Sequence, residues 1–284
     1  MIRDTRRALW SVLLAFSTAL AACGGGGDSA PTPSPTPVEP VGQVVQSTLA
    51  SAENGFTYTL QVYLPASYPT GTTTLPVIYA TEGDAPFGVG SSGATGGSVR
   101  SRFETLKEAM QRRGTQAILV GISGTARRDV DFLLPGAAKY VSFIARELAP
   151  SIERQYRADP KRRALSGLSH GGYFVVAALV LEGTAGPLSF SHYLSTESSF
   201  GGHPNVAAYL DFEKQLAGTG KPMPATLFLA GANTSNGPVV VNPLYEQMVS
   251  QKIPGLTLLK SDYPTTHVGA DVPAFEEALA RFFP

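Results

Sequence analysis

One short stretch constrains the fold of this chain more than any other. Residues 163–168 form a predicted buried strand, Gly167-x-Ser169-x-Gly171 a sharp turn, and the apolar run from Tyr173 to about Leu181 a helix. A serine at such a turn is held in a strained backbone conformation with its hydroxyl clear of the sheet, and the glycines avoid clashes with the neighbouring strand and helix. The order strand, turn, helix therefore predicts Ser169 as a nucleophile. A glycine turn without chemistry is the alternative.

Hydrophobic periodicity extends this unit into an α/β fold. The expected strands are 44–52, 56–64, 75–80, 117–122, 190–194, 225–230 and 256–260, the first two paired with each other. The expected helices are 99–112, 138–156, 205–216, 243–251 and 272–282, the last with Asp271 as its N-cap. Strands that alternate with helices predict a mostly parallel, twisted sheet with helices on both faces. No insertion is long enough for a separate lid domain.

Composition favours one catalytic domain, residues 44–284. A chain of 284 residues with 43% hydrophobic content can bury one substantial core. The formal net charge is zero and no long run of Lys or Arg is present, which argues against a nucleic-acid binder. We therefore expect a small substrate that is uncharged or of mixed charge.

Residues 1–22 are typical of a bacterial signal peptide. Three arginines precede an apolar run, residues 8–22, that is too short for an ordinary membrane span. Both the general secretory route and the twin-arginine route stay open, because Arg6-Arg7 matches the twin-arginine pattern only in part.

The residues after the apolar run predict a lipid anchor. Leu20-Ala21-Ala22-Cys23 resembles the lipobox of bacterial lipoproteins, so Cys23, the only cysteine, is the expected lipidation site. Gly24 resembles the residue that lets a lipoprotein reach the outer membrane. The Gly- and Pro-rich sequence that completes residues 23–43 has almost no large apolar group and predicts a flexible tether. We expect a protein anchored in the cell envelope at the outer membrane, facing the periplasm or the cell surface.

The base is chosen from four histidines. His170 belongs to the turn and His192 to a predicted strand, while His203 comes earlier than the order Ser, acid, His places the base. His267 lies between the last expected strand and the last expected helix. The order of the chain therefore predicts His267 as the base that activates Ser169.

The acid is less clearly marked. It is expected after the strand 225–230, yet residues 231–237 contain no carboxylate. Glu197 follows the preceding strand and reaches the same histidine from an alternative strand end, although a surface loop acid is an equal interpretation. The other candidates are Asp262, Glu246, and a Ser-His dyad whose ring is oriented by Asn233 or Asn236.

Two loops flank the expected site. Thr81-Glu82-Gly83-Asp84 follows the strand 75–80, where the amide of Asp84 is the expected first oxyanion donor and the amide of His170 the second. For the side chains of Glu82 and Asp84 we expect turn formation only. The glycine-rich residues 88–97 lack the ending of a phosphate-binding loop and predict a mobile rim. The charges of residues 127–131 either line the site as an ion pair or are solvated.

Together these segments resemble the putative-esterase (esterase D-like) branch of the α/β-hydrolases, which includes enterochelin-type siderophore esterases, S-formylglutathione hydrolases, feruloyl esterases and mycolyltransferases. The resemblance rests on residues 75–84, 118–122 with Arg128 and Asp131-Phe132 after them, 164–172, and His267. It implies the α/β-hydrolase fold, Ser169 and His267 as nucleophile and base, and the amides of Asp84 and His170 as oxyanion donors. Glu82 stands where the family usually has Asp, and Thr234 falls near its usual acid position.

The sequence thus predicts a serine carboxylester hydrolase of the cell envelope. Such an enzyme needs no metal or organic cofactor, because Ser169, His267 and two backbone amides supply the chemistry. The resemblance suggests a siderophore ester or another small-molecule ester as substrate. Acyl transfer to an alcohol at the same site stays open. So does a catalytically inactive hydrolase fold that acts as a binding lipoprotein.

Overall fold

The computed structural model describes residues 42–87, 100–199 and 220–283. The strands of the main sheet are β1 (Gln43–Ala50), β2 (Thr57–Leu64), β3 (Leu75–Ala80), β6 (Ile118–Ile122), β7 (Ala158–Leu168), β8 (His192–Thr196), β9 (Ala225–Ala232) and β10 (Leu256–Tyr263). A separate ribbon pairs β4 (Pro86–Phe87) with β5 (Arg100–Ser101). The α-helices are α1 (Arg102–Arg113), α2 (Arg128–Asp131), α3 (Gly136–Phe143), α4 (Ala149–Gln155), α5 (His170–Ala185), α7 (Asn242–Gln251) and α8 (Asp271–Phe282).

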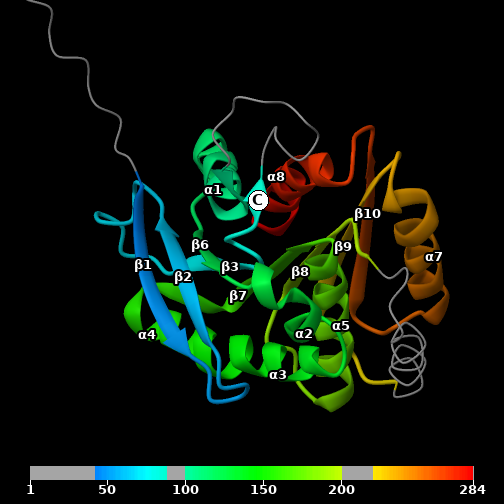
Figure 1. Ribbon diagram of the computed structural model, residues 1–284, viewed down its shortest axis with the longest axis horizontal. Coiled ribbons are helices and arrows are strands. Elements are labelled where there is room, and N and C mark those ends of the chain that lie inside the picture. The colour runs from blue at the N-terminus through cyan, green and yellow to red at the C-terminus, as the bar shows by residue number, and fades with distance from the viewer. Residues whose placement is uncertain (1–41, 88–99, 200–219, 284) are drawn as a thin grey trace, which may run out of the picture. The chain divides into compact units, whose positions relative to one another are not determined.

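The main sheet has eight strands among the described residues, in the order β1-β2-β6-β3-β7-β8-β9-β10 (Figure 1). The six strands from β6 to β10 run parallel, while β2 is antiparallel to β6 and β1 antiparallel to β2. This arrangement confirms the predicted α/β-hydrolase class, a mostly parallel sheet with an antiparallel edge.

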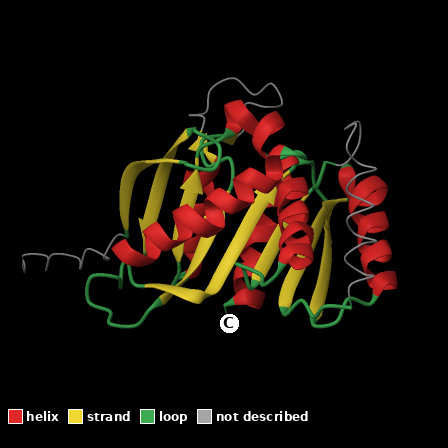
Figure 2. Cartoon of the chain, turned by 90° about the horizontal axis from the view of Figure 1, so that it is seen from below, coloured by secondary structure: helices red, strands yellow, loops and turns green. Residues whose placement is uncertain are grey.

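Helices cover both faces of the sheet, as predicted (Figures 1 and 2). Alternate residues of β3 enter different cores: Val77 and Tyr79 join the core under α3, α4, α5 and α7, whereas Ile78 and Ala80 join the core under α1 and α8. A strand buried on both faces has no polar side, which explains its continuous apolar sequence. Among the described residues, no helix is both long and apolar enough to cross a bilayer.

The predicted strand pair 44–52 and 56–64 is confirmed as β1 and β2, but the later strand boundaries shift. The strand expected at 190–194 runs from His192 to Thr196, because Gly167 and Leu168 of β7 pair with Ser195 and Thr196. The strands β9 and β10 likewise continue past their apolar runs to Ala232 and Tyr263, which pair with each other. Ladder hydrogen bonds extend through polar residues that hydrophobicity does not mark.

The helix predicted over 138–156 is interrupted by a π-helical stretch, η2 (Ile144–Leu148), between α3 and α4. Pro150 follows in α4 and has no N–H for a bond to the preceding turn. The amide of Ala149, just before Pro150, bonds to the carbonyl of Ile144, five residues earlier. This is the hydrogen bond of a π-helix, and the helix accommodates the proline through it. A second π-helical stretch, η3 (Gly237–Val241), precedes α7 and its Pro243 in the same way.

Several helix ends also differ from the prediction. α1 begins at Arg102 rather than near residue 99, because Ser101 and Glu104 form a capping box. α5 begins at His170, directly after Ser169. Asp271 is the first residue of α8 rather than its N-cap, and its carboxylate is bound to Arg102. Four predicted features lie outside the described residues: the signal peptide, most of the tether, the glycine-rich rim 88–97 and the helix 205–216.

Candidate active site

The turn at Ser169 has the strained geometry that its sequence predicts. Ser169 joins β7 to α5 with φ 60° and ψ −115°, a left-handed φ that few side chains adopt. A Cβ on Gly167 would lie 2.1 Å from the carbonyl oxygen of Gly171, so a glycine is required there. The backbone of Ser169 is also held by the end of β8 and the loop after it, since its N–H donates to the carbonyl of Thr196 and its carbonyl accepts from the Ser199 amide.

Four neighbouring parallel strands bring the candidate residues to one edge of the sheet. The strands β7, β8, β9 and β10 are adjacent and in this order. The residues after their carboxyl ends include Ser169, Glu197, Asn236 and His267, respectively. The carboxyl ends of parallel strands lie at the same edge, which is where ligands bind in open α/β sheets.

Glu197 and His267 form the central contact of the site. Oε2 of Glu197 and Nδ1 of His267 are 2.9 Å apart, and the Glu197 side chain is completely buried. The amides of Ala232 and Asn236 donate to the same carboxylate. Burial alone would raise the pKa of Glu197, but the hydrogen bonds from His267 and from these two amides outweigh it and lower the pKa below its usual range. The carboxylate is therefore ionised at neutral pH.

Asn236 connects this pair to the nucleophile. Its side-chain amide donates to the carbonyls of Glu197 and Ser198 and to the hydroxyl of Ser199. The Ser199 hydroxyl in turn lies 3.1 Å from the hydroxyl of Ser169. Among the described residues the Ser169 hydroxyl bonds to Ser199 and not to His267. Nucleophile and base are thus in one hydrogen-bonded cluster, although they do not touch in this structure.

The loop after β3 lies on the other side of the nucleophile. The amide of Gly83 bonds to Ile122, whereas the amide of Asp84 has no acceptor among the described residues, as an oxyanion donor requires. The second expected donor, the amide of His170, directly follows Ser169 and belongs to the first residue of α5.

The expectation that the side chains of Glu82 and Asp84 only form a turn is wrong. The Asp84 carboxylate accepts from the amides of Gly124 and Thr125 and from the Thr125 hydroxyl. These bonds tie the loop after β3 to the loop after β6. Glu82 is buried at a φ of 52°, and its carboxylate lies 3.4 Å from Nε of Arg128. Burial raises the pKa of Glu82, and the charge of Arg128 offsets this only in part.

The charged residues 127–131 do not share one role, and the pair Arg127–Asp131 fits neither of the two that the sequence suggested, because Asp131 is buried. Arg128 lines the site, since it contacts Glu82 and also lies 2.8 Å from Nδ1 of His170. Arg127 pairs with the buried Asp131, which also accepts from the Tyr58 hydroxyl, so this pair is structural. Asp129 is largely exposed.

Among the described residues, none of the other candidates forms a hydrogen bond with the ring of His267. Asp262 pairs with Lys260, the carbonyl of Thr265 accepts from Thr234, and the exposed Asn233 uses its backbone amide in a bond to Tyr263. His192 packs against the ring of Phe282, and burial lowers its pKa. Glu246 lies within α7, and His203 lies outside the described residues.

Sequence reasoning missed Ser199 and the pair Arg102–Asp271. Ser199 lies two residues after Glu197, but a serine in a polar loop carries no local signal. Arg102 and Asp271 are 169 residues apart, and each is the first residue of its helix, so only their burial in the folded protein marks them.

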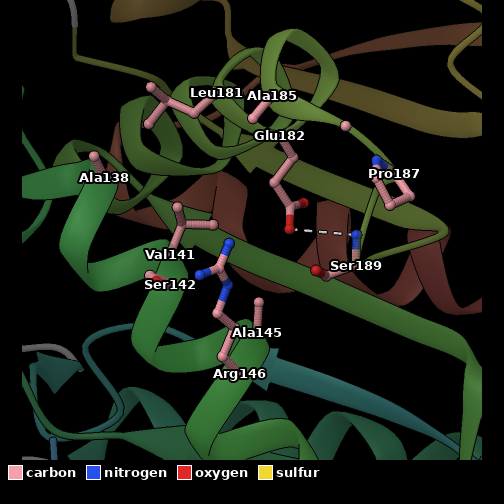
Figure 3. Close-up of a pocket in the computed structure, with 11 residues that line it drawn as sticks. Ala138, Val141, Ser142, Ala145, Arg146, Leu181, Glu182, Ala185, Pro187 and Ser189 are labelled. Atoms are coloured by element: carbon pink, nitrogen blue, oxygen red, sulfur yellow. Dashed lines mark hydrogen bonds between the residues drawn. The ribbon is translucent and has the colours of Figure 1, made fainter. Parts of the chain in front are cut away.

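A cavity of about 450 Å³ lies elsewhere, between α3, η2 and the end of α5 (Figure 3). Apolar and small side chains line most of it, and Arg146 and Glu182 supply its charges. The Glu182 carboxylate accepts from the Ser189 amide and the Tyr193 hydroxyl. The cavity is at the opposite end of α5 from Ser169 and contains none of the candidate catalytic residues.

Comparison with known proteins agrees with this geometry. A sequence model of the family described as putative esterase matches residues 51–202. Ferri-bacillibactin esterase BesA of Bacillus subtilis (strain 168) is 28% identical in an alignment of 134 positions that covers 36% of this chain and 45% of that protein. The match therefore spans less than half the length of that relative.

Solved structures share the fold. An IroE-like serine hydrolase from Shewanella oneidensis is 23% identical with a TM-score of 0.67, over 84% of this chain and 79% of that one. The siderophore hydrolase EstA from Aspergillus nidulans is 18% identical with a TM-score of 0.67, over 84% of this chain and 93% of that one. The architecture is that of the α/β-hydrolases.

Proposed function

Because this chain belongs to the putative esterase family, we propose that it hydrolyses carboxylic esters through a serine acyl-enzyme. The observation that carries the proposal is the 2.9 Å contact between Glu197 and His267 at the sheet edge where Ser169 occupies its strained turn. A histidine oriented by a buried carboxylate is the arrangement that activates a serine hydroxyl.

The proton positions follow from the charge of Glu197. An ionised carboxylate only accepts hydrogen bonds, so Nδ1 of His267 carries the ring proton and Nε2 is the acceptor. Nε2 then takes the proton of Ser169 as its hydroxyl turns from Ser199 toward the ring. Hydrogen bonds of this kind are often long before substrate binds.

The remaining steps use the same few groups. The oxygen of Ser169 attacks the ester carbonyl, and the amides of Asp84 and His170 donate to the oxyanion that forms. His267 returns its proton to the departing alcohol. A water molecule, deprotonated by the same ring, then attacks the acyl-enzyme and releases the carboxylic acid and free Ser169.

We propose siderophore-type esters as the substrate class. The names of two similar proteins, a ferri-bacillibactin esterase and a siderophore hydrolase, support this class.

We also propose that Cys23 is lipidated and anchors the protein at the outer membrane, where it would meet siderophores on their way into the cell. The lipobox-like sequence Leu20–Cys23 supports the anchor. Replacing Cys23 with serine should abolish incorporation of radioactive palmitate.

Two other functions were considered, acyl transfer and a catalytically inactive fold that acts as a binding lipoprotein. The observation that suggested the binding lipoprotein no longer supports it. It was suggested by the missing carboxylate after β9, and Glu197 supplies a carboxylate from the loop after β8. Acyl transfer uses the same residues, and the two reactions are separated by their products. With an alcohol acceptor present, hydrolysis releases free acid whereas transfer forms a new ester.

The test uses the purified mature protein with short-chain, aryl and trilactone esters, together with a fluorophosphonate probe. We expect ester cleavage and labelling in the wild type, and neither in Ser169→Ala. A folded wild type that is not labelled and cleaves no ester would reject the proposal. Preference for the trilactone over aryl esters supports the siderophore class, and the reverse preference rejects it.

A further inference from the structure

Arg102, the first residue of α1, is only 1% exposed although it carries a charge. Its Nε and Nη2 lie 2.7 and 2.9 Å from the two carboxylate oxygens of Asp271. Nη1 lies 2.8 Å from the carbonyl of Thr81 and 3.5 Å from that of Ser166, and Nη2 lies 3.1 Å from the Ser166 hydroxyl. A guanidinium has five N–H donors, so each of them has an acceptor here.

The three partners belong to the three segments that carry the candidate chemistry. Thr81 precedes the loop with the Asp84 amide, and Ser166 lies in β7 three residues before Ser169. Asp271 begins α8 four residues after His267, and η4 (Val268–Ala270) fills the short interval. One planar group therefore touches the oxyanion loop, the nucleophile strand and the segment of the base.

The backbone at the start of α1 holds the same loop. The amide of Arg102 donates to the carbonyl of Ala85 at 2.9 Å, and the amide of Phe103 donates to that of Gly83 at 3.1 Å. These carbonyls flank Asp84 on both sides. The peptide expected to donate to the oxyanion is thus held between two bonds from the helix that presents the guanidinium.

Stability alone does not account for a buried ion pair. Apolar residues of similar volume often replace such a pair without loss, because desolvation cancels most of the attraction. A second ion pair, Arg112–Glu276, joins the same two helices at 2.8 Å on the surface and touches none of the three segments. The buried pair therefore does more than connect α1 to α8.

We infer that Arg102 is a positioning residue, which sets the spacing of the Asp84 amide, the Ser169 hydroxyl and the His267 ring through its contacts with Thr81, Ser166 and Asp271. Its effect on catalysis rests on the proposed esterase function. Its effect on the three segments does not. A displacement of about 1 Å in such a site costs about 100-fold in rate.

The test compares Arg102→Met/Asp271→Leu with the matched surface pair Arg112→Met/Glu276→Leu. In the buried double variant we expect kcat to fall by about 100-fold with KM within about threefold of the wild type, since chemistry is lost and not binding. Hydrogen exchange of residues 81–87 and 264–271 should accelerate. The surface double variant should match the wild type in both measurements, and circular dichroism checks that each variant is folded.

A folded buried variant with wild-type kcat and wild-type exchange overturns the inference. A wild type that cleaves no ester rejects the proposed function only, because the exchange comparison still decides whether Arg102 fixes the segments. If the buried double variant does not fold, Arg102→Lys replaces it, since an ammonium retains Asp271 but lacks the fork that reaches Thr81 and Ser166 together. Faster exchange of residues 81–87 in Arg102→Lys then supports the inference, and unchanged exchange overturns it.

Discussion

The carboxylate of Glu197 and the ring of His267 lie 2.9 Å apart although 70 residues separate them in the sequence. Glu197 follows β8 and His267 follows β10, so the contact crosses the end of the intervening strand β9. The end of β9 and the loop after it support the contact through the backbone amides of Ala232 and Asn236, and the loop supplies no carboxylate of its own. The carboxylate that contacts His267 therefore follows a strand one position earlier in the chain than the strand after which the acid is expected.

Replacing Glu197 with glutamine should lower kcat by about 100-fold or more, because the ring of His267 loses the acceptor that sets its tautomer. Asp262→Asn is the matched control, since Asp262 pairs with Lys260 and not with the ring. Steady-state kinetics on one activated ester measures both variants. Equal losses in the two variants would mean that Glu197 does not orient the base.

The contribution of Glu197 to stability should depend on pH. Its pKa is lower in the folded protein than its usual value, so the unfolded chain binds the proton more tightly. The stabilisation is therefore complete above the unfolded pKa of about 4.3 and disappears as the pH falls through the folded pKa. Urea unfolding from pH 7 to 3 should show the gap between wild type and Glu197→Gln closing with acid. A gap of constant size would contradict the assignment.

Gly167→Ala should destabilise the fold by about 1–3 kcal/mol, because the new methyl group would overlap the backbone of Gly171. Gly186→Ala is the control at the other end of α5, where nothing lies within 4 Å of the added Cβ. Thermal unfolding compares the two variants with the wild type. A Gly167→Ala protein as stable as Gly186→Ala would show that the turn is looser than its geometry indicates.

Arg128→Met should cost stability mainly at neutral and higher pH. The pKa of Glu82 is already raised by burial, so its charge opposes folding above the folded pKa and the nearby Arg128 reduces that cost. Because Arg128 is 34% exposed and its charge is screened, we expect a loss of only about 1 kcal/mol at pH 7. Urea unfolding should show the loss shrinking with acid as Glu82 is protonated.

The double variant Glu82→Gln/Arg128→Met supplies the control for this pair. With no carboxylate at residue 82, its stability relative to Glu82→Gln should show none of the pH dependence that the charge of Glu82 causes. If Arg128→Met loses the same amount of stability at every pH from 8 to 4, then Arg128 does not stabilise the protein through the charge of Glu82.

The sequence by itself determined the local features of this protein. The strained turn at Ser169 follows from Gly167 and Gly171, because short-range sterics allow few other residues there. The alternation of buried strands and amphipathic helices follows from hydrophobic periodicity. The choice of His267 as the predicted base follows from its place between the last strand and the last helix. Boundaries were less accurate at β8 and in the helix over 138–156, where ladder pairing and Pro150 override periodicity.

Only the tertiary structure decided which distant groups meet. Glu197 was one of several acids until the strand order placed the end of β8 beside those of β7 and β9. The five contacts of Arg102 with Asp271, Thr81 and Ser166 join residues from far apart in the chain. Hydrophobic periodicity and turn-forming residues depend only on neighbours within a few positions in the sequence. The choice of partner depends on how strand ends and helix starts converge at one edge of the sheet, and no short segment carries that information.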